Sequence, residues 1–168
     1  MNANPTAQHA ILRTAYELSI SQLAAQRSDL VGYRNQASFC AAVSGIIATV
    51  FASLGGESLL EKFTQEPVFV SLSLGGFMVL AVFTASNAFA VLVLVSWKEC
   101  CFDIAPLWMV GMSENGHTED QILEEAVEDA HGFLAENEKS IAHVRTYIWW
   151  ASVLSVVQIP FWLILLLS

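Results

Sequence analysis

Apolar side chains recur every three or four residues along the last third of the chain. The stripe comprises Leu123, Val127, Ala130, Leu134, Ile141, Val144 and Ile148. This spacing places the side chains on one face of a helix. The same stretch begins with several carboxylates and ends in the uncharged, apolar residues 159–167. We therefore predict one long helix that begins in water and ends in lipid.

A second helical pattern covers residues 5–34. Asn4 and Pro5 suit a helix start, because asparagine caps a helix and proline fits its first turn. The predicted apolar face contains Ile11, Ala15, Leu18, Leu23, Leu30 and Val31. The opposite face mixes arginines with acids, which is typical of a helix that packs on a partner helix and not of one that lies flat on a membrane.

Three uncharged stretches are long enough to cross a bilayer: residues 35–54, 68–96 and 147–167. A helix rises about 1.5 Å per residue, so about 20 residues span a hydrocarbon core of about 30 Å. Gly55 and Gly56 end the first predicted span, and we expect an external loop over 55–67. Residues 97–117 form a connector that ends in a turn at Asn115 and Gly116.

The residues Thr118 and Gln121 have the spacing of a capping box, which predicts the start of the long helix. Residues 118–146 would form an acidic cytoplasmic helix that leads directly into the third span, over 147–167. Residues 5–34 would lead in the same way into the first span. The two polar helices are then parallel and form a cytoplasmic stalk.

Composition supports an all-α membrane protein. Of the 168 residues, 55% are hydrophobic and only 14% are charged, and the charges are segregated. The length indicates one domain. The net charge of −9 argues against nucleic-acid binding. Six of the seven Lys and Arg residues lie before the first span or between the second and third, which predicts a cytoplasmic N-terminus and an external C-terminus in the cell inner membrane.

Small residues follow one another along the predicted spans. They are Ala37, Ala41, Gly45, Ala48, Ala52, Gly75 and Gly76. Small side chains let helices approach closely in lipid and gain van der Waals contact. Three spans are few to bury these faces, so we expect a homo-oligomer surrounded by membrane lipid.

Three polar residues fall at similar depths within the predicted spans: Ser44, Asn87 and Gln158. Polar groups in lipid must find partners, so they hydrogen-bond across helices or line a wet cavity. Two interpretations follow. The residues form a polar clamp that fixes the register of the helices, or they form a polar layer in a conduction path between subunits.

Carboxylates crowd the start of the acidic helix. They are Glu119, Asp120, Glu124, Glu125, Glu128 and Asp129. Such a run is typical of a solvated helix face, and it also fits a site for cations or a surface for a basic partner or a trigger. Glu128 and His131 have a spacing used in di-iron bundles, but no second copy exists. Cys100, Cys101 and His117 lack zinc-ligand spacing. We expect no cofactor, no metal and no enzymatic activity.

The stretch Gln22–Phe51 reads QLAAQRSDLVGYRNQASFCAAVSGIIATVF. A polar helix with Asp-Leu-x-x-Tyr-Arg-x-x-Ala that runs into a small-residue span resembles small bacterial integral membrane proteins, a set that overlaps the SLATT-like membrane effectors of nucleotide-signalling and anti-phage systems. The later helix with Asn137, Glu138 and Lys139 before the last span is similar too. The resemblance implies membrane permeabilisation by oligomerised subunits, triggered by a cytosolic sensor protein, with no catalytic residues.

Two functions remain from the sequence. The first is an oligomeric membrane effector that permeabilises or depolarises the membrane in anti-phage defence when a cytosolic signal or partner triggers it. The second is a non-conducting membrane anchor or adaptor that docks a cytosolic partner through its acidic helix. A transporter fits less well, because the spans contain neither an internal repeat nor a charge.

Overall fold

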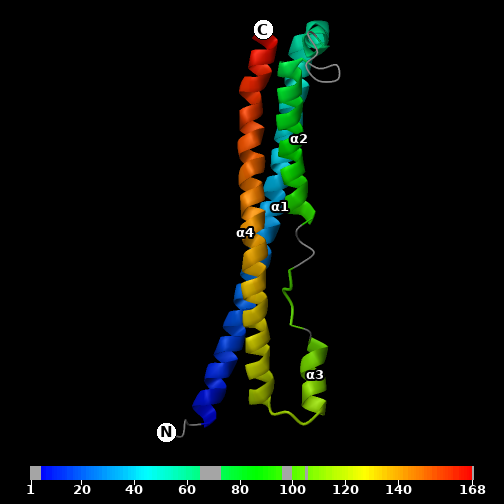
Figure 1. Cartoon of the computed structure of the whole chain (residues 1–168). Coiled ribbons are helices and arrows are strands. Elements are labelled where there is room, and N and C mark those ends of the chain that lie inside the picture. The colour runs from blue at the N-terminus through cyan, green and yellow to red at the C-terminus, as the bar shows by residue number, and fades with distance from the viewer. Residues whose placement is uncertain (1–4, 65–72, 96–99, 105, 168) are drawn as a thin grey trace. The chain divides into compact units, whose positions relative to one another are not determined.

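The computed structural model describes residues 5–64, 73–95, 100–104 and 106–167, and every regular element within them is helical (Figure 1). The elements are α1 (Pro5–Thr64), α2 (Leu74–Val95), α3 (Pro106–Glu114) and α4 (Glu119–Leu167). Of these, α1, α2 and α4 contain stretches long and apolar enough to cross a membrane. The all-helical class and the three long apolar helices expected from the sequence are confirmed.

Helix α4 is one continuous helix of 49 residues, which confirms the uninterrupted helix predicted from the apolar stripe. The predicted capping box opens it. The Thr118 N–H donates to Gln121 Oε1 at 3.0 Å, and the Gln121 N–H donates to Thr118 Oγ1 at 3.4 Å. Two backbone donors at the start of the helix are thus satisfied by side chains. Pro160 lies inside the helix without ending it.

Helix α1 has a backbone interruption at Gly56, where φ is 51° and ψ is −140°. Glycine adopts such a positive φ without the steric penalty that a Cβ would bring. The interruption falls where the sequence predicts the end of the first span. The expected loop over 55–67 is wrong for residues 57–64, which are helical because leucine, glutamate and lysine there favour a helix. Residues 65–67 lie outside the described residues.

The connector expected over 97–117 contains the short helix α3. Pro106 occupies its first turn, where the missing N–H removes no helical hydrogen bond. The predicted turn ends it, with Gly116 at φ 84°. The His117 N–H donates to Met112 O and the Gly116 N–H to Ser113 O, a Schellman motif that satisfies the last carbonyls. The predicted second span covers 68–96, and its residues 68–72 and 96 lie outside the described residues.

The single domain expected from the chain length divides into two compact units. The polar unit comprises Met1–Val31 and Lys98–Ala142, and the apolar unit comprises Gly32–Trp97 and His143–Ser168. Along the sequence, the divisions lie close to the boundaries predicted between polar helix and span.

The polar unit has a core of Leu23, Ile104, Ala126 and Ala130, with Trp108 of α3 packed against it. Helices α1 and α4 run parallel in it. His9 Nδ1 lies 2.6 Å from Asp120 Oδ1, and further along Gln26 Nε2 donates to Leu134 O at 3.2 Å.

The apolar face predicted for residues 5–34 is partly wrong. Ile11 and Leu18 are 68% and 59% exposed, whereas Leu23 and Leu30 are fully buried. The face of α1 that packs in the polar unit carries Ser19, Leu23 and Leu30, so these residues are buried. Ile11 and Leu18 lie outside this face.

In the apolar unit, α1 and α4 are again parallel, and α2 runs antiparallel to α4. Ser44 of α1 forms a hydrogen bond with Gln158 of α4. On α2, Ser86 pairs with Ser155, whereas Val79 packs near Trp162, further along α4. The Phe51 and Trp162 rings stack with centroids 5.8 Å apart. The three apolar helices therefore form one packed bundle within this unit.

One buried seam follows α4 for almost its whole length. Its members are Leu123, Ala126, Ala130, Asn137, Ile141, Val144, Ile148, Ala151, Ser155, Gln158, Trp162 and Leu165. Over 137–165 the steps alternate between four and three residues, the heptad spacing of helices that pack side by side. The seam is mostly apolar, so each polar residue in it marks a specific interaction.

Candidate functional site

The three polar residues singled out from the spans meet in the apolar unit. Ser44 Oγ donates to Gln158 Oε1 at 3.2 Å, and Asn87 Nδ2 donates to Ser44 Oγ at 3.4 Å. Asn87 Nδ2 also donates to the Phe83 carbonyl at 2.9 Å. One residue from each of α1, α2 and α4 therefore contributes to a single polar layer.

Hydroxyls extend this layer along the seam of α4. Ser86 Oγ lies 2.8 Å from Ser155 Oγ, and Ser155 Oγ lies 2.8 Å from the Ala151 carbonyl. Cys40 Sγ lies 3.3 Å from Ser152 Oγ. Hydrogen bonds of this kind are favoured in lipid, where water offers no alternative partner. They fix which turn of each helix faces which turn of its neighbours.

Gln158 has an unusual environment in the layer. Its side chain is fully buried, and its Nε2 has no hydrogen-bond partner within the described residues. A buried donor without a partner carries a desolvation penalty of roughly 1–3 kcal/mol. The carboxamide is therefore held in place by packing and by the one bond from Ser44.

The burial of the layer favours the clamp over the conduction path. Ser44 and Gln158 are both 0% exposed, enclosed by helices of one chain. A path between subunits needs polar groups on the outer surface of the apolar unit. Within the described residues these two side chains do not reach that surface, so their geometry is that of an internal register clamp.

The predicted small-residue stripe of α1 divides between two faces. Ala37 is fully buried, Ala41 and Ala48 are half-buried, and Ala52 is exposed. A Cβ placed on Gly45 would meet no atom within 4 Å. On α2, Gly76 is buried, and a Cβ on Gly75 would lie only 3.1 Å from Leu165 Cδ1. Gly75 thus allows α2 and α4 to approach closely, while Gly45 and Ala52 face outward.

The outward side of α1 carries hydroxyls that the sequence analysis did not single out. We define the hydroxyl face as Ser38, Ala42, Gly45, Thr49 and Ser53. Apart from the half-buried Gly45, all are exposed. Thr49 Oγ1 and Ser53 Oγ donate to the carbonyls of Gly45 and Thr49, at 2.9 and 2.8 Å. Their oxygens keep acceptor capacity toward a neighbour. The spacing of three and four residues was the signal that identifies this face.

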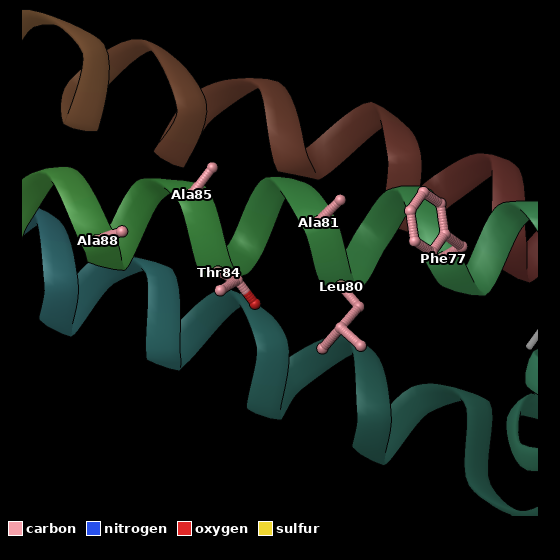
Figure 2. Close-up of a pocket in the computed structure, with 6 residues that line it drawn as sticks. All are labelled: Phe77, Leu80, Ala81, Thr84, Ala85 and Ala88. Carbon is pink, nitrogen blue, oxygen red and sulfur yellow. The ribbon is translucent and has the colours of Figure 1, made fainter. Parts of the chain in front are cut away.

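A shallow pocket of about 400 Å³ lies on α2, lined by residues of that helix alone. Figure 2 shows the lining side chains, Phe77, Leu80, Ala81, Thr84, Ala85 and Ala88. Leu80 and Thr84 point to one side of α2, and Ala81 and Ala85 point to the other. The small side chains expected to promote packing here leave a depression whose only side-chain polar group is the Thr84 hydroxyl.

The acidic residues of α4 separate into two groups. Asp120 and Glu119 face His9, with closest distances of 2.6 and 3.8 Å. Glu124, Glu125, Glu128 and Asp129 are exposed, and none has an ion pair in the described part of the chain. We call these four the acidic surface. Asp120 and Glu119 thus lie at the contact with α1, although Glu119 remains 77% exposed, and the other four form the part of the cluster that faces only solvent.

Asn137 is a structural residue whose role the sequence analysis missed. It is 1% exposed, its Nδ2 donates to the Cys101 carbonyl at 2.7 Å, and its Oδ1 accepts from the Cys101 N–H at 3.0 Å. The side chain thus holds the segment before α3 against α4. A polar residue between Leu134 and Ile141 on the apolar stripe was the available signal, because a buried polar residue in a seam needs a specific partner.

No group of three His, Cys, Asp or Glu side chains suited to a metal ion occurs among the described residues. Glu128 and His131 are both exposed on α4. Three polar features remain as candidate sites. The apolar unit contains the internal polar layer and carries the hydroxyl face on its outer surface, and the polar unit carries the acidic surface.

Comparison with known proteins adds no information about these features. No protein-family model matches the chain, and neither a curated protein nor a solved structure matches it.

Proposed function

We propose that this chain is an integral membrane effector that assembles into homo-oligomers and permeabilises or depolarises the membrane when a cytosolic signal or partner acts on it. The hydroxyl face of α1 is the observation that carries this proposal. The polar layer is used inside one chain, whereas the hydroxyl face carries Ser38, Thr49 and Ser53 on the outside of the first apolar stretch.

The side chains of the hydroxyl face are small, which suits contact between copies of this chain. Gly45 is open to the outside, and alanine and hydroxyl side chains flank it. In lipid, helices associate through such faces because their backbones approach closely and their hydroxyls find partners. Around a symmetric assembly the same hydroxyls would line a polar route, since polar groups in membranes face a partner or a water-filled cavity.

The proposed placement follows from the Lys and Arg distribution. The polar unit lies in the cytoplasm with the N-terminus, and the C-terminus lies outside the inner membrane. Helices α1 and α4 then form the stalk, and each is continuous from the polar unit into the apolar unit. A role in anti-phage defence, with a cytosolic sensor protein as trigger, rests on the resemblance to SLATT-like effectors.

Liposome leakage tests the proposal. The full-length protein, reconstituted at increasing protein-to-lipid ratio, should release an entrapped dye at a rate that rises more steeply than protein density. Gly45→Leu should slow release roughly tenfold, because a loss of about 1.4 kcal/mol in helix association is a tenfold change in its constant. Thr49→Val keeps the shape and should slow release without dissociating the oligomer.

Val156→Leu provides the matched control, because Val156 is 66% exposed on α4 and outside the hydroxyl face. Its leakage should equal that of the wild type. Liposomes that stay tight at every protein density, with a monomeric chain in detergent, would refute the effector function. Leakage that Gly45→Leu leaves unchanged would refute the role of the hydroxyl face.

The acidic surface favours a second function, a non-conducting anchor or adaptor that docks a basic cytosolic partner. Glu124 with Glu128, and Glu125 with Asp129, are like-charged pairs four residues apart, which destabilise a helix by a few tenths of a kcal/mol each. A partner that neutralises them would remove this repulsion.

Reversing the four charges together should abolish capture of a cytosolic partner by the membrane-embedded protein, while leakage stays unchanged. The control neutralises the exposed acids Glu17 and Asp29 of α1 and should retain capture. Partner capture that survives the reversal contradicts the adaptor function.

A further inference from the structure

A groove of about 470 Å³ lies between α1 and α4 in the polar unit, where the two helices run side by side (Figure 1). Its lining includes Gln22, Ala25 and Gln26 of α1 and His131, Leu134 and Ala135 of α4. All of these residues belong to the same compact unit. We propose that this groove binds a basic amphipathic helix of a protein partner, with the apolar face of that helix on α1 and its cationic side chains on α4.

The α1 side of the groove carries exposed apolar side chains. Along one side of this helix, in steps of four and three residues, lie Ile11, Ala15, Leu18, Gln22 and Ala25. Gln22 and Ala25 line the groove, so Ile11 and Leu18 continue its rim toward the start of α1. Ile11 is 68% exposed and Leu18 is 59% exposed. Apolar side chains aligned beside a groove are typical of a protein interaction site.

The α4 side of the groove carries acids at the same spacing. In steps of four and three residues, one stripe of this helix contains Glu124, Glu128, His131, Ala135 and Glu138. The last three line the groove, so the stripe brings Glu124 and Glu128 to its rim. Both of these carboxylates are exposed, and neither forms an ion pair in the described part of the chain. Glu125 and Asp129 are outside the stripe, so only half of the acidic surface borders the groove.

The charge of the polar unit favours a basic partner over a second copy of this chain. Met1–Val31 and Lys98–Ala142 contain four Lys and Arg against thirteen Asp and Glu, so this unit carries the whole formal charge of −9. Two such surfaces repel each other, whereas a cationic segment is attracted and steered toward the groove.

The two rims match the shape of a helix that lies along the groove. The contacts of His9 with Asp120 and of Gln26 with Leu134 set a parallel register in which Leu18 and Glu128 are level. A helix with apolar residues on one face and cations beside them would therefore meet both rims at once.

Gln26 offers a further polar contact in the wall of the groove. Its Nε2 donates to the Leu134 carbonyl, and its buried Oε1 has no hydrogen-bond partner among the described residues. An acceptor left in this way costs free energy, so a lysine or arginine that reaches the wall would supply the missing donor.

This site rests on the cytosolic partner contained in the proposed function, but not on leakage. The probe is a fluorescent peptide of about 18 Leu and Lys residues, five helical turns, with its leucines on one face. Fluorescence anisotropy measures its binding to the full-length protein in phosphatidylcholine nanodiscs, with empty nanodiscs as the blank. The wild type should bind it about tenfold more tightly than a peptide of the same composition whose leucines lack helical spacing.

Variants on both rims test the groove directly. Leu18→Gln should weaken binding about tenfold, equivalent to about 1.4 kcal/mol. Glu124→Gln combined with Glu128→Gln should weaken it by about the same factor and reduce its dependence on salt. All three side chains are exposed, so the variants should fold.

Glu125→Gln combined with Asp129→Asn is the matched control, because it removes two charges from α4 outside the stripe. It should keep the wild-type affinity. Equal weakening by the two double variants, or equal binding of the two peptides, would overturn the groove in favour of non-specific attraction to the acidic surface. A Leu18→Gln variant that binds the peptide like the wild type but loses its oligomeric mass would overturn it in favour of contact between copies.

Two outcomes separate this site from the proposed function. Liposomes that stay tight while the peptide binds with the expected preferences would refute the effector and support the groove. A wild type that makes liposomes leak but binds no more peptide than empty nanodiscs do would overturn the groove alone.

Discussion

Replacing Gln158 with alanine should lower the free energy of unfolding of the apolar unit by about 2–4 kcal/mol, because truncating a fully buried side chain leaves a cavity. Replacing it with leucine should change that free energy by less than about 1 kcal/mol. Leucine fills most of the same space and removes the Nε2 donor that has no partner among the described residues. Ser44 loses its acceptor, but a serine hydroxyl in a helix can donate to a preceding carbonyl.

The measurement is unfolding of the full-length protein in mixed micelles with increasing SDS, followed by tryptophan fluorescence. Val156→Ala serves as control, since its exposed position should give a change within about 0.5 kcal/mol. If leucine destabilises as much as alanine does, hydrogen bonding and not packing holds the polar layer together. If neither variant differs from the control, Gln158 does not clamp the helices.

How far the sequence predicts this site depends on what each pattern encodes. Depth along a helix follows from residue counting, so counting alone assigns Ser44, Asn87 and Gln158 to similar depths. The direction in which a residue faces is harder to predict in an apolar stretch, because both faces of the helix are apolar and periodicity carries little information. Counting therefore could not decide between an internal clamp and a path between subunits, because that distinction depends on which side chains are buried.

Helix α4 was predictable because its polar half exposes one face to water. Carboxylates lie opposite an apolar stripe there, and Thr118 and Gln121 mark its start. The buried face of helix α1 was less predictable. Ile11 and Leu18 are exposed although they are large and apolar, and Ser19 is buried although it is polar. The buried face of α1 is set by contacts with residues about 110 positions later in the chain, and local spacing does not contain them.

The helix α3 was not predicted either. Its nine residues are apolar around most of their circumference, so no amphipathic period marks them. Its end was predictable, because Asn115 and Gly116 supply the turn. The segment before it depends on Asn137, whose side chain bonds both backbone groups of Cys101. Such a tertiary contact has no local signature beyond one polar residue in an apolar stripe.

The core of the polar unit gives the second large expected effect. Leu23→Ala should lower the free energy of unfolding of this unit by about 2–5 kcal/mol. Leu23 is fully buried, and its cluster joins α1, Ile104, α3 and α4. The neighbours Ala126 and Ala130 are already small, so they have no longer side chain to fill the cavity. Leu18→Ala is the control, because Leu18 is 59% exposed and should change stability by no more than about 0.5 kcal/mol.

Hydrogen exchange of the full-length protein in micelles distinguishes the two units. A loss of about 3 kcal/mol raises the exchange rate of fully protected amides about a hundredfold when exchange follows the opening equilibrium. Peptides from residues 119–142 should show this increase in Leu23→Ala, and peptides from 147–167 should keep wild-type protection, because every residue of the Leu23 cluster belongs to the polar unit. Equal acceleration in both sets would mean that the units unfold as one.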